Sequence, residues 1–526
     1  MNTALLLDEP EVIAGFDAAP VAVVAPVRPP RAVAPAPRRE QLPSVVERNA
    51  KVRDGTFGVK LMEPRSLQFI AETCAGELRS GKSAALVTRV CTDSRQAQPG
   101  DLFFALSGDR FDGHTFVKDV AALGATAVVV DRAKGFWSLG GCAVIAVDNP
   151  RTALGLLAAR HRREFELPVI AVGGSNGKTT TKELIAAVLR QKFIALWSEA
   201  SFNNDIGVPL TLLKLERTHG AGVFEVGTNH PGELAPLVRM IQPQYGVVTS
   251  LGREHLEFFH DLAGVAQEEG WLAELLPASG KLFVNGDNPG MEQITRRARA
   301  TIVSVGFERG NHWLAEDVRL DAQGTTFTAH APNQKLSGEY RINLLGRHMV
   351  GNALLAMAVG EELGLSREQL QRALAGCTPP KMRLQVWETN GVCVLDDAYN
   401  ANADSMRAAL RTLHDLPCAG RRIAVLGDMA ELGEQTTEAH IEVGRYAVEQ
   451  GVQQLYAVGR MAGVVATAAR AAGLQNVYEF ADVADAGPVV KAAVRPGDVV
   501  LLKASRATRL ERVGDALRGE PNATSN

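Results

Sequence analysis

The chain has 526 residues, enough for about three domains of ordinary size, with 46% hydrophobic and 22% charged residues, a balance typical of globular proteins. A net charge of −3 argues against nucleic-acid or membrane-surface binding through bulk charge, and no apolar run approaches the roughly 18 residues of a membrane span. Six cysteines without a CxxC pair, and an N-terminal apolar stretch without a basic flank, favour a cytoplasmic protein over a secreted, disulfide-bonded one.

The N-terminal part of the chain has the composition of an extended segment. Residues 20–43 contain seven prolines and four arginines, which cannot build a packed core, so we predict a disordered extension over residues 1–60. The first ordered unit, residues 61–150, alternates helical pieces with short strands. Its segment AALGATAVVVD, residues 121–131, predicts a helix end followed by a buried strand. We expect a domain boundary in residues 150–166.

The second unit, residues 151–378, alternates strands with helices. It opens with the strand LPVIAVGG (167–174), followed by a glycine-bearing loop and a helix over residues 178–191. Further strands are predicted in AGVFEVG (221–227) and YGVVTSLG (245–252). This alternation predicts a parallel sheet with crossover helices.

The third unit, residues 379–526, begins at a proline pair and repeats the pattern of short apolar strands that end in polar residues. The predicted strands are 392–400, 421–429, 454–460 and 498–506. In open α/β sheets ligands bind at the carboxyl ends of the strands, so we expect the polar residues there to face a ligand.

The strongest local motif is a phosphate-binding loop between a predicted strand and a predicted helix. It consists of Gly174, Ser175, Asn176, Gly177, Lys178, Thr179 and Thr180. Glycines let backbone N–H groups close around phosphate oxygens, Lys178 would reach the β- and γ-phosphates, and the Thr179 hydroxyl would bind Mg²⁺. Val172 occupies the first glycine position of the strict pattern, but the shorter G-x-x-G-K-T core is intact. The alternative is a surface glycine turn before a helix.

Two polar residues at neighbouring strand ends suggest a metal site beside the phosphates. Glu225 ends the strand AGVFEVG, and His255 follows VVTSLG. A carboxylate and an imidazole there could both reach a metal ion. Each alone could equally be a solvated or packed side chain.

Two other polar clusters could be functional or could have only a structural role in helix capping. SFNNDIGVP (201–209) precedes a proline and could be a helix-capping turn. GRHMVGNALLAM (346–357) places His348 and Asn352 four residues apart on one helical face, and could also be a capped helix start.

The ordered set of motifs resembles the Mur ligase family from about residue 65 to about residue 515. In the first unit the resemblance is carried by TDSRQAQPGDLFFAL and GDRFDGHTF. In the second it is carried by GSNGKTTTKE, NNDIGVPLTLL, EVGTNHPGEL, LGREHLE and GRHMVGNALLA, and in the third by MRLQV, DDAYNANADSM, LGDMAELGE and LKASR. GTNHPGEL and YNANADSM are similar to the branch that adds D-alanyl-D-alanine. The DNPR signature of the diaminopimelate-adding branch is absent from the third unit; it occurs only at 148–151, at the expected first boundary, where we discount it.

The resemblance implies an α/β protein of three domains. The first would hold the UDP end of UDP-N-acetylmuramoyl-tripeptide, the central domain would be a P-loop parallel-sheet ATPase, and the Rossmann-like C-terminal domain would close over the site with the amine. It implies ligation of D-Ala-D-Ala through an acyl phosphate for peptidoglycan synthesis, with ATP and Mg²⁺. We expect a monomer, but the sequence itself does not give the oligomeric state. The alternatives are a diaminopimelate-adding ligase, a folylpolyglutamate synthase, which the TDSR motif disfavours, or a regulator that hydrolyses ATP only to switch conformation. Lysine and diaminopimelate both remain open at the third peptide position.

The resemblance also implies roles for residues at matching positions. Lys178 and Arg383 would neutralise the crowded anionic groups, and Thr179, Glu225 and His255 would bind Mg²⁺. Residues implied at ATP or the acyl phosphate are Asn204, Asn352, Arg383, Asp397, Asn400 and Asn402. Residues implied at the peptide substrates are Lys503, Ser505 and Arg506, and those implied at the uridine nucleotide are Thr92, Asp93, Ser94 and Arg95.

One position departs from the family pattern. Most Mur ligases carry a lysine after the histidine motif that forms a carbamate with CO₂ and helps hold the second Mg²⁺; here VAQEEGWL (265–272) puts Glu269 at that position. We predict that its carboxylate replaces the carbamate, with the helix closer to the metal or a water between them, and that bicarbonate is not needed. The neighbouring Glu268 points about 100° away on a helix. The alternative is that Glu269 is a solvated helix residue.

Overall fold

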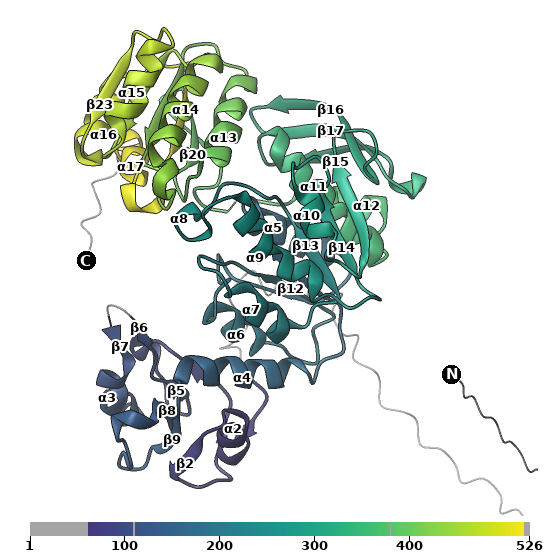
Figure 1. Cartoon of the computed structure of the whole chain (residues 1–526), viewed down its shortest axis with the longest axis vertical. Helices are drawn as coiled ribbons and strands as arrows, with labels where there is room; N and C mark the ends of the chain where they lie inside the picture. Colours follow the sequence, from purple (N-terminus) through teal and green to yellow (C-terminus); the bar gives the residue numbers. More distant parts are fainter. Residues whose placement is uncertain (1–61, 109–110, 379, 520–526) are drawn as a thin grey trace, which may run out of the picture. The chain divides into compact units, whose positions relative to one another are not determined.

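The computed structural model describes residues 62–108, 111–378 and 380–519. The predicted extension over residues 1–60 lies outside the described residues, and so does Pro379 of the predicted proline boundary. Three larger sheets organise the described residues, and Figure 1 shows their elements in chain order from purple through teal and green to yellow. The α/β class is therefore confirmed.

The first unit is built from short strands and two short helices. Its elements are β1 (Arg65–Ser66), α2 (Leu67–Thr73), β2 (Glu77–Ser80), β3 (Leu86–Val87), β4 (Val90–Cys91), β5 (Leu102–Phe104), β6 (Ser107–Gly108), β7 (Phe111–Asp112), α3 (Val117–Ala122), β8 (Ala127–Asp131) and β9 (Ala143–Val147). Five strands pair in the order β2-β9-β8-β5-β4, all parallel except β2. The helix end and strand predicted in residues 121–131 are confirmed as α3 and β8.

Helix α4 (Pro150–Arg162) occupies the segment in which we expected the first boundary. Asn149 begins it by accepting two N–H groups of its first turn with the side-chain oxygen. Near its end the buried Arg162 donates to the carbonyls of Ile241 and Phe165, at 2.8 and 2.7 Å. The segment is thus a helix tied by hydrogen bonds to the central unit.

The central unit contains nine strands in one sheet. Its elements are β10 (Val169–Gly173), α5 (Lys178–Leu189), β11 (Ala195–Trp197), α6 (Gly207–Leu212), β12 (Ala221–Glu225), α7 (Leu234–Ile241), β13 (Tyr245–Val248), α8 (Leu256–Phe259), α9 (Leu262–Glu274), β14 (Lys281–Asn285), α10 (Met291–Thr295), β15 (Thr301–Gly306), β16 (Trp313–Asp321), β17 (Gly324–His330), β18 (Gly338–Ile342), α11 (Arg347–Glu362) and α12 (Arg367–Ala375). The strand order is β11-β12-β10-β13-β14-β15-β16-β17-β18. The three predicted strands and the helix are confirmed as β10, β12, β13 and α5.

The far end of this sheet was not predicted. From β11 to β16 the strands are parallel, but β16, β17 and β18 are antiparallel neighbours. These three strands follow one another without a crossover helix, so the strand–helix alternation that indicated a parallel sheet does not extend to them.

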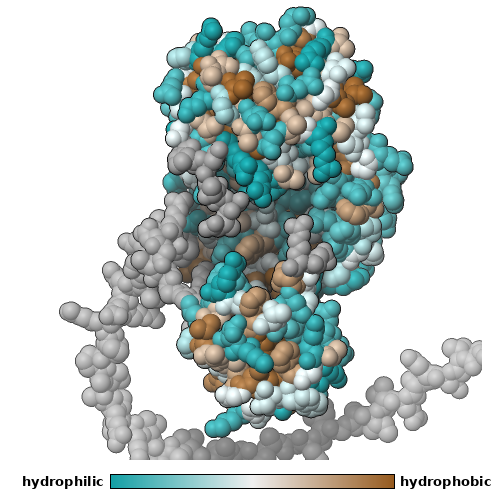
Figure 2. All heavy atoms as spheres, turned by 90° about the vertical axis from the view of Figure 1, so that its left-hand side faces the viewer, coloured by the Kyte–Doolittle hydropathy of each residue, from teal (hydrophilic) through white to brown (hydrophobic). Residues whose placement is uncertain are grey.

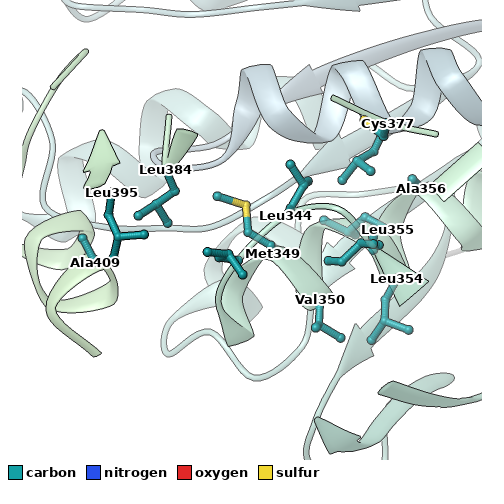
Figure 3. Close-up of a cluster of buried hydrophobic side chains, with 14 of the residues drawn as sticks. Leu344, Met349, Val350, Leu354, Leu355, Ala356, Cys377, Leu384, Leu395 and Ala409 are labelled. Atoms are coloured by element: carbon teal, nitrogen blue, oxygen red, sulfur yellow. The ribbon is translucent and has the colours of Figure 1, made fainter. Parts of the chain in front are cut away.

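The central strand β10 is buried on both faces and fixes where the phosphate loop begins. Ile170 and Val172 pack with α5 and α11 on one face, while Val169 and Ala171 pack with α7 and α9 residues on the other. Figure 3 shows part of the first cluster, with side chains projecting from α11. Burial on both faces makes β10 a rigid base for the loop that follows it.

The third unit holds a six-stranded sheet. Its elements are β19 (Gln385–Thr389), β20 (Val392–Asp397), α13 (Ala403–Asp415), β21 (Arg422–Gly427), α14 (Thr436–Glu449), β22 (Gln454–Val458), α15 (Ala462–Ala471), β23 (Val477–Phe480), α16 (Val483–Ala493), β24 (Val499–Lys503) and α17 (Glu511–Arg518). The order is β19-β20-β24-β21-β22-β23, parallel except for β19. The four predicted strands are confirmed as β20, β21, β22 and β24, and the carboxyl ends of β20, β24 and β21 are neighbours.

The surface carries no extended apolar face in the view of Figure 2, where brown residues are scattered among teal ones. Exposed large side chains such as Leu86, Phe111 and Trp137 are of the kind found on ordinary globular surfaces. Within the described ranges, none of the helices combines the length and apolar character that a membrane crossing requires.

Replacing Arg162 tests whether α4 is a structural tie. Arg162→Met leaves two buried carbonyls without their donor, so we expect a loss of about 2 kcal/mol of stability, seen as a thermal midpoint several degrees lower. Arg160→Met is the control, because the half-exposed Arg160 forms one ion pair with Glu164 and lies over the Phe69 ring but donates to no buried carbonyl; the change should cost less than about 1 kcal/mol. Equal thermal midpoints for the two variants would contradict the idea that the hydrogen bonds of Arg162 hold α4 to the central unit.

Candidate active site

A cavity of 1480 Å³ collects most of the predicted site residues. Those that line it are Ser175, Asn176, Gly177, Lys178, Thr179, Thr180, Asn204, Glu225, His255, His348, Asn352, Arg383, Asp397, Asn400, Asn402, Lys503, Ser505 and Arg506. Polar loops of the second and third units therefore share one cavity, as the strand ends predicted.

The phosphate loop needs glycine at two positions. Gly174 has φ +107°, and a Cβ there would lie 2.6 Å from the Thr249 hydroxyl; Gly177 has φ +85°, and a Cβ there would lie 2.9 Å from Asn352 Oδ1. Gly177 leads directly into α5, whose N-terminus has no side-chain cap. The first N–H groups of this helix thus face the cavity without a side chain to satisfy them, an arrangement that suits a phosphate.

Lys178 lies among carboxylates. Its Nζ donates to Glu254 Oε2 and to the Ser175 carbonyl, both at 3.3 Å. Burial alone would lower the pKa of Lys178, but nearby negative charges outweigh it and hold the pKa above its usual value. These charges belong to Glu254, Glu269 and Glu225. Sequence reasoning missed Glu254, although it precedes His255 in the same motif.

Glu225 is placed beside the loop by sheet pairing. β12 pairs with β10 so that Glu225 stands opposite Val172. Its Oε1 accepts from the Thr179 hydroxyl at 3.1 Å and from Asn203 Nδ2 at 2.9 Å, while its Oε2 is buried without a hydrogen-bond partner. The side chain thus combines a fixed oxygen with a free one.

Glu269 lies directly behind the loop, on α9. It is fully buried, so the alternative of a solvated helix residue is wrong. Its Oε2 accepts from the Gly174 N–H at 2.7 Å, whereas Oε1 is buried without a partner. Gly173 permits this approach, because a Cβ there would lie 2.9 Å from Oε2. Burial raises the pKa of Glu269 to about 7.

The adjacent Glu268 has a different task. Its two carboxylate oxygens accept from the N–H groups of Gly232 and Leu234, at 2.9 and 2.8 Å. It therefore holds the loop before α7 and is not free for a ligand, in keeping with the predicted divergence of the two side chains.

The donor set fits Mg²⁺ bound together with nucleotide phosphates. Glu225 Oε2 and Glu269 Oε1 are two buried carboxylate oxygens without partners, and the Thr179 hydroxyl stands beside the first of them. Among the described residues no group of three or more His, Cys, Asp or Glu could hold a metal by itself. Mg²⁺ commonly takes one or two carboxylates and completes its shell with phosphates and water, so such a group is not required.

His255 is engaged elsewhere. It has φ +49°, and its Nδ1 pairs with Glu431, whose pKa this contact lowers. His255 lines the cavity, but it forms no metal-binding group with Glu225 and Glu269 in the part of the chain that the structure describes. Its role as a metal ligand stays a prediction.

The site role that we predicted for Asn204 is shared between Asn204 and its neighbour Asn203. Asn204 Oδ1 accepts from the N–H groups of Ile206 and Gly207, which is the capping alternative, while the adjacent Asn203 reaches Glu225. Both line the cavity. Spacing alone could not tell which of two neighbours turns inward.

The paired residues on α11 meet the loop from the other side. Asn352 lies against Gly177, as its close approach to the glycine shows. Burial lowers the pKa of His348 to about 4, so this imidazole is neutral at ordinary pH.

The third unit contributes fixed loops. Lys503 is buried, and its Nζ donates to Asp397 Oδ2 at 2.6 Å and to the Asn400 carbonyl at 3.1 Å. Asn402 caps α13 and also donates to Asn176 Oδ1 at 3.0 Å. These contacts order the strand-end loops of the third unit.

Two further residues complete this wall. The Arg383 guanidinium lies 4.3 Å from the centre of the Tyr399 ring, and Ser505 donates to the Ala401 carbonyl at 3.1 Å. Arg506 is exposed beside them. The substrate roles of these residues stay predictions.

The residues expected at the uridine nucleotide do not line this cavity. Asp93 begins a short turn and forms a two-point contact with the exposed Arg95, at 2.9 and 2.8 Å. Thr92 and Ser94 flank Asp93 in the chain. Their role also stays a prediction.

One wall of the cavity was missed entirely. It consists of Asn149, Arg151, Thr152, Gly155, Leu156, Ala159 and Arg163 around α4, and Pro236, Leu237, Arg239 and Met240 of α7. Because we assigned residues 150–166 to a boundary, no side chain there was considered. The helical pattern of that segment was the available signal.

Family models match most of the chain. The Mur ligase middle domain matches residues 172–360, the Mur ligase glutamate ligase domain matches residues 382–506, and the Mur ligase family catalytic domain matches residues 86–162.

Whole proteins and solved structures are similar over nearly their full length. UDP-N-acetylmuramoyl-tripeptide–D-alanyl-D-alanine ligase of Escherichia coli (strain K12) is 34% identical, covering 86% of this chain and 98% of the relative. The ligase of the same name from Bacillus subtilis (strain 168) is 33% identical, with 86% and 98% covered. The crystal structure of MurF from Acinetobacter baumannii has a TM-score of 0.81 at 31% identity, covering 88% and 100%; MurF of Thermotoga maritima in complex with ADP has 0.73 at 26%, covering 82% and 97%.

In the metal-free protein, Glu269→Gln should change how stability depends on pH. In the folded protein the pKa of Glu269 is about 7, above the unfolded value of about 4.3. Between these two pH values the folded state therefore binds a proton that the unfolded state has released. The stability that this proton contributes is lost as the pH rises through about 7. Relative to wild type, Glu269→Gln should gain up to about 3 kcal/mol between about pH 5 and about pH 8. Thermal midpoints in EDTA measure this, with Glu292→Gln, whose carboxylate is exposed on α10, as control. A wild-type-to-variant difference that is constant with pH would contradict it.

Proposed function

The chain belongs to the Mur ligase family, and on that premise we propose that it joins D-alanyl-D-alanine to UDP-N-acetylmuramoyl-tripeptide with ATP, in peptidoglycan precursor synthesis. The observation that carries the proposal is one cavity that unites the phosphate loop from Ser175 to Thr180, a free carboxylate oxygen of Glu225 beside it and ordered strand-end loops of a third unit; Gly174 and Glu269 lie behind the loop and do not line the cavity. Relatives with this named activity match 86% of this chain and 98% of their own length.

The chemistry has two stages. A carboxylate is a poor acyl donor because its charge repels a nucleophile, so transfer of the γ-phosphoryl group from ATP converts the tripeptide carboxylate into an acyl phosphate. The amine of D-Ala-D-Ala then attacks the acyl carbon, and the tetrahedral intermediate expels phosphate. Both stages depend on bringing anionic groups together, so catalysis is mainly positioning and electrostatic stabilisation.

The chain's residues supply that environment. Lys178 lies in the loop in its charged form and would contact the transferring phosphoryl group. The N–H groups at the start of α5 would bind the adjacent phosphate groups of ATP. Glu225, Glu269 and Thr179 would hold Mg²⁺, which neutralises phosphate charge when bound. Arg383 would stabilise the acyl phosphate, and loops of the third unit would exclude the water that hydrolyses it.

We propose the same boundaries and partners as the sequence indicated. Residues 61–150 would bind the uridine nucleotide through Thr92 to Arg95, residues 151–378 would bind ATP, and residues 379–526 would hold the amine through Lys503, Ser505 and Arg506. The six cysteines are free thiols, which supports a reducing cytoplasm, and we propose a monomer.

Substrate choice and Lys178 are tested together. ADP release should require both a UDP-muramyl tripeptide and D-Ala-D-Ala, and a panel with lysine or diaminopimelate at the third position identifies the natural precursor.

Lys178→Ala should lower the rate about 10³-fold or more because a buried cation at the phosphoryl group is lost. Lys192→Ala, whose lysine bonds the Leu363 and Gly364 carbonyls away from the cavity, should ligate normally. ADP release without any amine, or a Lys178→Ala rate within about tenfold of wild type, argues against the assignment.

The replacement of a carbamate by Glu269 gives a separate prediction. Ligation should not respond to added or depleted bicarbonate, and Glu269→Ala should cut the rate about 10²-fold and shift its Mg²⁺ dependence to higher concentration. Glu274→Ala, at the end of the same helix, should do neither. A wild-type rate for Glu269→Ala across a Mg²⁺ titration would show that the carboxylate is not a ligand.

A further inference from the structure

We propose that Lys182 is a positioning residue that holds Glu225 in place for the metal ion. The inference rests on the proposed function. It assigns a role to Lys182 and to the segment after β11, to which that function gives none. Lys182 lies on α5, one turn after Lys178, and its side chain is fully buried.

All three donors of this ammonium are used. Its Nζ donates to Glu183 Oε1 at 2.6 Å, to the Ser198 carbonyl at 2.7 Å and to the Ala200 carbonyl at 2.8 Å. Two of the three acceptors are main-chain carbonyls of one short segment, residues 198–203, that follows β11. Lys182 is therefore an anchor for that segment.

The anchored segment contacts Glu225 from two directions. Ser198 Oγ accepts from the Glu225 N–H at 3.1 Å, and Asn203 Nδ2 donates to Glu225 Oε1 at 2.9 Å. The Asn203 carbonyl also accepts from the Gly227 N–H at 2.9 Å. The segment thus fixes both the backbone and the carboxylate of Glu225, and Oε2 is left as the free oxygen.

The segment would not hold this shape unaided. Ala200 has φ +46°, a conformation that L-residues with a Cβ disfavour. Its carbonyl is one of the two bonded by Lys182. The buried cation therefore stabilises a strained turn at the point where the chain swings toward Glu225.

A purely structural interpretation leaves the charge unexplained. An apolar side chain of similar length could fill the same volume, and a buried cation carries a desolvation cost that well-packed hydrophobic residues do not. What the ammonium adds is a fixed set of three hydrogen bonds, and two of them end on the segment that contacts Glu225. The same helix thus carries the lysine for the phosphates and the lysine that orders the metal ligand.

Mn²⁺ binding in the presence of ADP provides the test, read by electron paramagnetic resonance of free Mn²⁺ and independent of ligation. Lys182→Met keeps the length of the side chain and removes the donors, and we expect about tenfold weaker Mn²⁺ binding, with ADP affinity in EDTA within about twofold of wild type. Lys192→Met removes another lysine that bonds two carbonyls and should bind Mn²⁺ as wild type does.

A second background decides whether the effect passes through Glu225. In a Glu225→Gln protein, adding Lys182→Met should change Mn²⁺ affinity by less than about twofold, because the ligand it positions is already lost. An equal loss in both backgrounds, or no loss in the wild-type background, overturns the inference. If Lys182→Met does not fold, Ser198→Ala, which removes only the acceptor for the Glu225 N–H, must weaken Mn²⁺ binding in the wild-type background alone. Failure of wild type itself to bind Mn²⁺ with ADP would instead overturn the metal site of the proposed function.

Discussion

The site depends on an imbalance of charge around one ammonium. Three carboxylates, those of Glu225, Glu254 and Glu269, act on Lys178, and two of them are almost fully buried beside it. In a region of low dielectric this excess of negative charge is unfavourable. Burial raises the pKa of Glu269, and the nearby charge of Glu254 acts in the same direction. In the proposed function, a divalent cation bound beside Glu225 would offset this excess of negative charge. Much of the surrounding structure serves to keep these groups at fixed distances.

Local patterns predicted the centre of the site well. A strand buried on both faces, two glycines and the lysine that opens α5 lie within a dozen residues, so the sequence spacing determines their geometry directly. The short strands of the third unit followed from the same short-range pattern, whereas its Rossmann-like arrangement was implied by the family resemblance. These features depend on few long-range contacts, which is why they could be read from the chain.

What sequence reasoning missed depends on long-range contacts or on rotation by one residue. Asn203 and Asn204 are adjacent, and only the fold of the 198–203 segment decides which one meets Glu225. The antiparallel strands β16 to β18 and the α4–α7 wall required knowing which distant segments meet. None of these choices is encoded in residue type alone.

The continuity of α4 has a consequence for how the protein can be divided. Leu154, Leu157 and Ala158 of this helix share one hydrophobic cluster with Leu67 and Phe104 of the first unit and with central-unit residues. A fragment ending at residue 150 would lose the helix that covers its own core, and a fragment beginning at residue 151 would lose the Asn149 cap and expose the opposite face. Expression of either piece alone should therefore yield aggregation-prone material, because α4 completes the hydrophobic core of both units.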